Sequence, residues 1–249
     1  MFQTLGLALT LYSTFVVTYL GTAFVIDMST IYRKIDRIRT HVSSNLSLQE
    51  LLDVKILSEC KTIKDDLYEY AHVAQVVFYN LFKVLPIYTI IISYMMLSLK
   101  DYYWSDPFIL RNEIGMILIS SIISDVFFYS YHRYFHMSAW WFKYIHYMNH
   151  EHQTNAYSIQ SQYCHPLEFV LNMTSFSVGI LLTNLHVMSV LTIMVYSIMM
   201  NLMSYTNKQY KIGTMVVYSS SYHQFHHNMM TVNFGIMYLS DYLYKTLKL

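Results

Sequence analysis

The residues with the clearest potential for chemistry are histidines that occur in three groups. Within each group the histidines are three or four positions apart, and residues at these spacings lie on one face of a helix. The imidazoles of each group therefore aim at one point. Imidazole nitrogen is a ligand for zinc, copper, iron and nickel. The sequence thus predicts a metal site built from seven imidazoles, those of His132, His136, His146, His150, His223, His226 and His227.

The number of imidazoles indicates how many ions the site holds. A tetrahedral zinc ion takes only four protein ligands, so seven imidazoles favour two ions. Iron is the metal expected if the chemistry involves oxygen, and the predicted cofactor is a pair of non-haem irons. A lone histidine on an apolar face is more often a structural residue with a hydrogen-bond partner. The occurrence of three histidine groups in a chain otherwise poor in ionisable residues favours the interpretation that these histidines are metal ligands.

Three further residues are weaker candidates. His152 lies about 200° around a continuing helix from His150, so it reaches the metals only if the chain turns it inward. The same condition applies to His165. Asp125 lies two helical turns before His132 in an apolar segment, where carboxylates are costly and tend to be functional. We expect it to accept a hydrogen bond from a ligand imidazole and to fix its tautomer. The alternative is a carboxylate that pairs with a lysine or tyrosine in helix packing.

The composition indicates a membrane protein. The chain is 55% hydrophobic and 12% charged, whereas soluble domains carry about a quarter charged residues. A net charge of +1 provides no basic face for nucleic acid, so nucleic acid is not an expected partner. The two cysteines, Cys60 and Cys164, do not make a disulfide framework.

Apolar runs, two of them interrupted by a single charged residue (Lys83 and Asp125), predict about five membrane spans in an all-α, multi-pass fold. A bilayer core about 30 Å thick needs about 20 apolar residues of helix. The last run would form a helix of about 58 Å, so it is expected to make two spans that turn near Thr183–His186. The runs are Met1–Ile26, Val73–Leu99, Ile114–Tyr131 and Phe169–Asn207. A cleaved signal peptide is the alternative for the first run, but its basic start and small-residue cleavage site are missing.

The charge pattern also predicts an orientation. Residues 28–71 begin with a cluster of cationic side chains, Arg33, Lys34, Arg37 and Arg39, and then alternate acidic and basic positions up to Glu69. The segment is expected to form amphipathic helices outside or on the membrane. Positive loops face the cytoplasm, so the N-terminus lies on the opposite side. Counting spans from this loop places residues 132–165 and 208–249 on its side as well. The predicted site therefore lies at the cytoplasmic face.

The three histidine groups, taken with their surroundings, resemble the fatty acid hydroxylase/sterol desaturase superfamily of membrane di-iron oxygenases. That family carries the spacings HxxxH, HxxHH and HxxHH in this order. The segments DVFFYSYHRYFH and HHNMMTVNFG, the latter followed by Asp241, are similar to its first and last motifs. QYCHPLE at residues 162–168 resembles the sterol C-4 methyl oxidase branch. The resemblance covers residues 115–246. It divides the chain into N-terminal spans with an amphipathic segment (1–110) and a hydroxylase-like domain (111–249).

The sequence departs from the family pattern at two places. Asn149 stands where the second motif has its middle histidine, and its amide oxygen is a weaker ligand that would act directly or through water. The family also has a histidine in the helix about 22 residues before the third motif, whereas the segment Asn201–Tyr205 contains none. The resemblance therefore implies that Asn149 is a site residue, with an amide in place of the family's imidazole.

The resemblance implies oxidation of a lipid, and of a sterol in particular, by O2 at a di-iron centre in the endoplasmic reticulum membrane. Electrons would come from an external donor such as cytochrome b5 and its reductase. The chain itself has no glycine-rich dinucleotide loop and no cysteine set for an iron–sulfur cluster.

Three alternatives remain open. The first is a divergent, catalytically inactive homologue that still binds metal. The second is a transporter, which would place its ionisable residues along a path through several spans. The third is a bis-histidine haem protein, which would place its histidine pairs on facing helices.

Overall fold

The structure is a computed structural model that describes residues 2–45, 54–99, 110–151, 157–183, 185–206, 209–212 and 215–248. Side chains are described for these residues except 35–63, 110–112 and 209–219. Within these ranges the fold is helical, as the sequence predicts, with one short two-stranded hairpin that the sequence pattern did not predict.

The long helices account for the predicted spans. In the part of the chain that the structure describes, four stretches are long and apolar enough to cross a membrane: Phe2–Lys34, Lys64–Leu99, Glu113–Met137 and Val187–Ser204. A shorter apolar helix, Pro166–Leu182, lies between the last two in the sequence. The helices concerned are α1 (Phe2–Asn45), α2 (Val54–Tyr79), α3 (Leu85–Leu99), α4 (Leu110–Met137), α7 (Pro166–Leu182) and α8 (Val187–Ser204). The turn predicted within the last apolar run is confirmed, because α7 ends at Leu182 and α8 begins at Val187.

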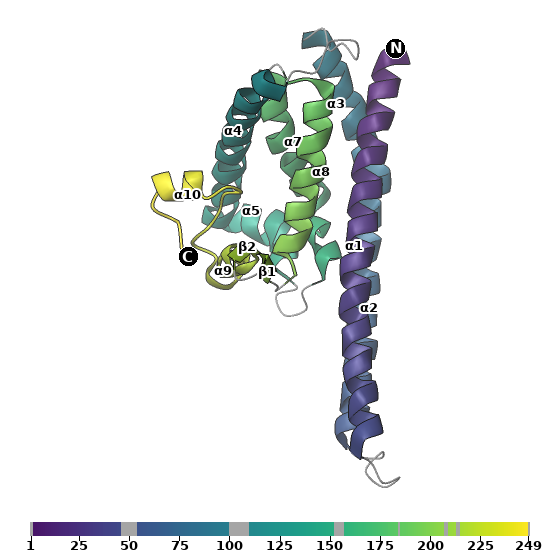
Figure 1. Ribbon diagram of the computed structural model, residues 1–249. Coiled ribbons are helices and arrows are strands. Elements are labelled where there is room, and N and C mark those ends of the chain that lie inside the picture. Colours follow the sequence, from purple (N-terminus) through teal and green to yellow (C-terminus); the bar gives the residue numbers. More distant parts are fainter. Residues whose placement is uncertain are drawn as a thin grey trace.

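Short elements gather at one end of the helices α4, α7 and α8 (Figure 1). The hairpin is antiparallel, with an irregular register between Tyr210 and Lys211. These elements are α5 (Ala139–Trp141), the π-turn η3 (Phe142–His146), α6 (Tyr147–His150), the 3₁₀ turn η4 (Ser158–Gln162), β1 (Gln209–Ile212), β2 (Met215–Ser219), α9 (Ser221–Met229) and α10 (Leu239–Leu243).

The first span does not end at the first charged residue, which corrects the prediction of separate amphipathic helices from residue 28. Helix α1 runs unbroken past Asp27 to Asn45, and α1 and α2 extend beyond the rest of the molecule (Figure 1). Asp27 is 1% exposed and its carboxylate accepts hydrogen bonds from the backbone N–H groups of Ser158 and Ile159. The buried charge is thus satisfied by tertiary contacts, so the helix has no reason to stop there.

The N-terminal helices hold the chain segment that leads into α7. The Tyr19 hydroxyl on α1 donates to the carbonyl of Ile159 at 2.6 Å. Asn80, in the π-turn η2 (Asn80–Val84) between α2 and α3, donates to the carbonyls of Gln162 and Cys164. These buried contacts fix the position of the first turn of α7.

Helices α4 and α7 approach each other closely at Gly179. A Cβ atom at this position would lie 2.3 Å from the carbonyl oxygen of Ser120 on α4, so only glycine fits. Small residues permit such close backbone contact between membrane helices. The contact sets the spacing of the two helices that carry His132 and Glu168.

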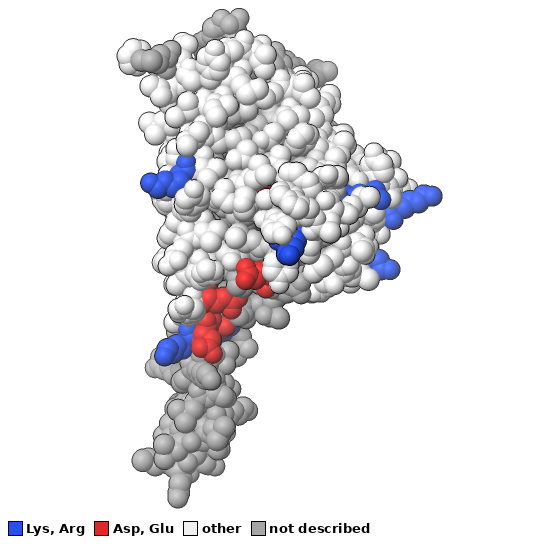
Figure 2. Space-filling view, turned by 180° about the vertical axis from the view of Figure 1, so that it is seen from behind, with Lys and Arg blue, Asp and Glu red and all other residues white. Residues whose placement is uncertain are grey.

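The surface agrees with insertion into a membrane. Figure 2 shows a broad uncharged area over the upper part of the molecule, with the acidic and basic side chains of this face below it. Many large apolar side chains are exposed on the span helices, such as Val17, Ile87 and Leu118. An apolar surface of this extent is stable next to lipid rather than water. The short elements around α9 lie at the end where the charges begin (Figures 1 and 2).

Candidate metal centre

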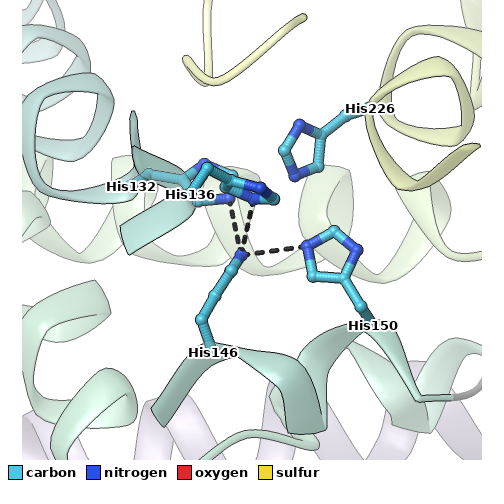
Figure 3. A group of neighbouring side chains, drawn as sticks. All are labelled: His132, His136, His146, His150 and His226. Atoms are coloured by element: carbon cyan, nitrogen blue, oxygen red, sulfur yellow. Dashed lines mark hydrogen bonds between the residues drawn. The ribbon is translucent and has the colours of Figure 1, made fainter. Parts of the chain in front are cut away.

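Five imidazoles from α4, η3, α6 and α9 point toward one another (Figure 3). One ring nitrogen of each lies within 4.8 Å of those of all the others. All but one of these histidines are buried, and the remaining one, His136, is half-buried. The group joins all three predicted histidine motifs and consists of His132, His136, His146, His150 and His226.

The nitrogens face one another at distances typical of ligands around one ion. The Nε2 atom of His146 lies 2.9 Å from Nε2 of His136, 2.9 Å from Nε2 of His150 and 3.2 Å from Nε2 of His132. Metal–nitrogen bonds of about 2.0–2.1 Å separate neighbouring ligand nitrogens by roughly 2.9–3.4 Å, depending on coordination geometry. The observed contacts fall in this range.

The hydrogen bonds made by the Nδ1 atoms leave Nε2 facing the other imidazoles. His132 Nδ1 donates to the carbonyl of Phe234 at 2.7 Å, and His146 Nδ1 donates to Glu168 Oε1 at 2.8 Å. A neutral imidazole that donates from Nδ1 has its lone pair on Nε2. In this tautomer the Nε2 atoms of the two rings, which lie 3.2 Å apart, are able to bind one cation.

An unpaired buried nitrogen supports the same assignment. His226 Nδ1 donates to the carbonyl of Val232 at 2.8 Å, while its Nε2 is buried without a hydrogen-bond partner. Buried polar atoms are normally satisfied, so unpaired ones require an explanation. Five nitrogen donors fit an ion such as iron, which accepts imidazole ligands and more than four donors.

Glu168 performs the role that the sequence analysis assigned to Asp125. It is 2% exposed, lies in the first turn of α7, and fixes the tautomer of His146 through the 2.8 Å hydrogen bond. A carboxylate in this position orients a ligand imidazole and increases its basicity. One signal for it was present in the sequence, because Glu168 immediately precedes the longest uncharged run.

Asp125 does not contact an imidazole, so the hydrogen bond expected from it is a wrong prediction. Its carboxylate accepts from the backbone N–H groups of Ile236, Met237 and Ser240 and from the Ser240 hydroxyl, at 2.6–3.0 Å. These donors lie at and just before the start of α10, where N–H groups lack helical partners. Asp125 thus anchors the C-terminal segment rather than a ligand.

A second carboxylate completes this anchor. Asp241 accepts from the backbone N–H groups of Phe234 and Gly235, at 2.9 and 2.6 Å. The anchored loop supplies the carbonyls of Val232 and Phe234 to two of the five imidazoles. Asp125 and Asp241 therefore act on the site through the backbone. A Cβ at Gly235 would lie 2.9 Å from both carboxylates, so this position requires glycine.

The other two predicted ligands lie beside the five. His223 and His227 on α9 have their Nε2 atoms 2.8 Å apart. The ring of His227 lies 4.4 Å from that of His150, measured between centroids. All seven predicted imidazoles are thus contiguous, although only His226 of the third motif belongs to the converging five.

Asn149 and Tyr205 lie next to His223 and His227. The Tyr205 hydroxyl donates to Asn149 Oδ1 at 2.9 Å, and Asn149 Nδ2 donates to Glu168 Oε1 at 3.3 Å. The ring of Tyr205 is 4.5 Å from the ring of His223. Asn149 therefore contacts Tyr205, the last residue of the segment in which the family's helix histidine is missing.

His165 lies outside the converging group. It is the N-cap of α7, and its Nδ1 accepts a hydrogen bond from the backbone N–H of Leu167 at 3.2 Å. Pro166 at the first helical position favours this capping role. His152 lies outside the described residues.

Burial keeps the imidazoles on α9 neutral, which is the form that binds metal. Removal from water lowers the pKa of His226 to about 4 and that of His227 to about 3, with nearby histidines adding to the effect. The pKa of His223 is lowered well below its usual value for the same reason.

The packing of the nitrogens argues against the haem and transport alternatives. Two axial imidazole nitrogens of a haem lie roughly 4 Å apart, twice a metal–nitrogen bond length, with the porphyrin between them. The rings here are closer and come from several directions (Figure 3). The converging histidines also belong to the C-terminal end of α4 and to η3, α6 and α9, elements that lie at one end of the helices α4, α7 and α8 (Figure 1), rather than to a path through the spans.

The fold and the site together define a helical membrane protein with a buried cluster of imidazoles suited to a metal. The chain matches the family model for fatty acid hydroxylase over residues 117–246, just over half of its length. It therefore belongs to the fatty acid hydroxylase family, as the spacing of the histidines indicated. Membership supports a membrane lipid oxygenase of the hydroxylase or desaturase type, in a family that is generally iron-dependent. No curated protein and no solved structure matches the chain.

Proposed function

We propose that the protein is a non-haem di-iron oxygenase that oxidises a lipid, with a sterol as its substrate, in the endoplasmic reticulum membrane. The observation that carries the proposal is the convergence of five buried or half-buried imidazoles, with one ring nitrogen of each within 4.8 Å of those of all the others. Family membership supports a lipid as the substrate. The likeness of residues 162–168 to the sterol C-4 methyl oxidase branch supports a sterol.

In this proposal the seven imidazoles hold the irons, which when bound activate O2 toward a C–H bond of the lipid. The chain's own residues provide the setting. Glu168 holds the proton of His146 at Nδ1, and the carbonyls of Val232 and Phe234 do the same for His226 and His132. Each bond keeps Nε2 available and fixes the ring plane. Burial excludes water from around the nitrogens, which strengthens electrostatic interactions there.

We further propose that the site faces the cytoplasm and receives electrons from a separate protein of the cytochrome b5 type with its reductase. The position of the site at the charged end of the helices supports access for such a partner (Figures 1 and 2). The absence of dinucleotide and iron–sulfur motifs from the sequence supports an external donor.

A catalytically inactive metal-binding homologue is the second candidate. The observation that favours it is the pair Asn149 and Tyr205, which occupies part of the site with side chains that bind metal weakly. Both candidates bind metal, so a lipid product is what distinguishes them.

The test is lipid profiling of cells that express the wild-type chain, His226→Ala or His165→Asn. His226→Ala removes a converging imidazole, whereas His165→Asn removes an imidazole outside the group and keeps an N-cap residue. We expect a new oxidised sterol with wild type and His165→Asn, and none with His226→Ala. A new oxidised acyl lipid instead would correct the substrate, and unchanged lipids with the wild-type chain would favour the inactive homologue.

A further inference from the structure

The imidazoles do not divide evenly between two ions. Five converge with their nitrogens within 4.8 Å of one another, and in the part of the chain that the structure describes this is the one group of three or more histidines, cysteines or carboxylates that does so. His223 and His227 remain as a pair, with 2.8 Å between their Nε2 atoms. An ion at this second position would find two imidazoles where the first finds five.

Two neutral side chains that are hydrogen-bonded to each other lie beside the pair, Tyr205 in contact with its rings and Asn149 behind it. The Tyr205 ring packs on His223, with 4.5 Å between centroids, and lies 5.6 Å from His227. The Tyr205 hydroxyl donates a hydrogen bond to Asn149 Oδ1. This oxygen is the one atom of the asparagine side chain able to bind a metal. Asn149 Nδ2 is directed to Glu168.

This arrangement disfavours metal binding at the second position because the neutral groups beside the pair are poor ligands. A protonated phenol is a poor ligand, and an amide oxygen that accepts a hydrogen bond has less electron density to give. Glu168 Oε1 accepts from both His146 and Asn149, which directs the Asn149 amide nitrogen away from the pair, while Glu168 Oε2 is buried without a hydrogen-bond partner.

We propose that the two metal positions are unequal, and that the Tyr205–Asn149 pair sets the difference by holding neutral groups beside His223 and His227. Loss of one supporting group costs about 10–100-fold in metal affinity, so we expect the second position to be at least about 100-fold weaker than the first. The first position then stays filled, whereas occupancy of the second follows the free metal concentration. This inference rests on the metal centre of the proposed function.

The test is a metal titration of the full-length protein purified in detergent and stripped of metal. Co²⁺ is added in place of Fe²⁺ in the presence of a competing chelator, and bound ions per chain are counted at each free concentration. For wild type we expect two binding phases at least about 100-fold apart. His223→Ala should remove the weak phase alone, and His136→Ala should weaken the tight phase.

Asn149→His tests the cause of the inequality, because it replaces the amide oxygen by an imidazole. We expect the weak phase to strengthen by about 10–100-fold while the tight phase persists. The matched control is Asn228→His, which adds an imidazole on the exposed side of α9 next to His227 and should change neither phase.

Several results would overturn the inference. Wild type could bind two ions in one phase, His223→Ala could weaken both phases equally, or Asn149→His could keep the tight phase and leave the weak phase unchanged. The first two results decide the matter even if Asn149→His does not fold. Wild-type protein that binds no ion would refute the metal centre itself, whereas unchanged lipids alongside two unequal phases would refute only the oxygenase activity.

Discussion

Glu168 and the two loop carbonyls act on different imidazoles of the same cluster. Glu168 is a carboxylate and bonds to His146, whereas His132 and His226 donate to the neutral carbonyls of Phe234 and Val232. A charged acceptor polarises the ring more strongly than a neutral one. His146 also lies closest to the middle of the cluster, since its Nε2 is within 3.2 Å of three other imidazole nitrogens. The best electron donor is thus the central one.

Glu168→Gln should lower metal affinity by about 10–100-fold, because the amide keeps the shape of the side chain but not its charge. The measurement is metal retained per chain against increasing chelator. The control is Glu151→Gln, which makes the same change on an exposed residue outside the converging group whose carboxylate accepts from the Tyr163 hydroxyl. Equal retention by both variants would show that the charge of Glu168 does not act on the site.

The lowered pKa values of His226 and His227 predict a loss of stability in acid for the metal-free protein. Both groups are neutral in the folded state down to pH of about 4 and 3, but in the unfolded chain they take up protons below about pH 6.5. The unfolded state therefore binds more protons in this window, and stability falls as pH decreases through it.

The measurement is the thermal unfolding midpoint of metal-free protein in detergent between pH 7.5 and 5. The double variant His226→Gln/His227→Gln should show a shallower dependence on pH than wild type. A wild-type midpoint that does not change over this range would contradict the predicted burial of neutral imidazoles.

The ligand histidines could be predicted from sequence because helix periodicity fixes which side chains share a face. His132 with His136, and His146 with His150, converge as this rule requires. The residues that orient them could not be predicted, because their partners are distant in the sequence. Asp125 bonds to a segment more than 100 residues away, and no spacing rule relates the two.

At the scale of elements, the loop between α9 and α10 acts as a clamp on two imidazoles. Its backbone carbonyls face His132 and His226, and its N–H groups are held by Asp125 and Asp241. Both carboxylates converge at Gly235. The loop therefore links the stability of the C-terminal segment to the geometry of the site.

Gly235→Ala should destabilise the protein by about 1–3 kcal/mol, because the added Cβ would lie 2.9 Å from Asp125 Oδ1 and Asp241 Oδ2. Metal affinity should fall as well, since the carbonyls that orient His132 and His226 would move. The two readouts are the unfolding midpoint and the metal retained against chelator. Gly115→Ala is the control, because nothing lies within 4 Å of a Cβ there. If the two variants behave alike, the loop does not act as a clamp.

The lengths of the apolar helices could be predicted from sequence, but the continuity of α1 could not. Run length sets how much helix a bilayer covers, and the turn between α7 and α8 follows from it. Asp27 resembles a helix end in the sequence, yet the backbone of η4 satisfies its carboxylate. Such a tertiary contact overrides the local charge pattern, because a satisfied carboxylate no longer needs water.

At the scale of the whole molecule, five spans would place the two termini on opposite sides of the membrane. The N-terminus and the C-terminal segment lie toward opposite ends of the span helices (Figure 1). The site lies at the same end of the span helices as the C-terminal segment. The basic residues that follow the apolar part of the first span favour the cytoplasm as the location of this end.

In sealed microsomes, external protease should therefore remove an epitope tag placed after Leu249 and spare one placed before Met1. Detergent should expose both tags, which is the control for intact vesicles. Protection of the C-terminal tag, or equal digestion of both, would contradict the proposed orientation of the site.

The most direct test of the central claim is the metal content of the purified full-length protein, measured by elemental mass spectrometry against protein concentration. We predict that wild type retains at least one iron per chain and that the double variant His136→Ala/His146→Ala retains none. Wild-type protein that folds in detergent and binds no iron when supplied with it would contradict the account. Equal iron in the double variant would contradict it too, because the five converging imidazoles would then not be its ligands.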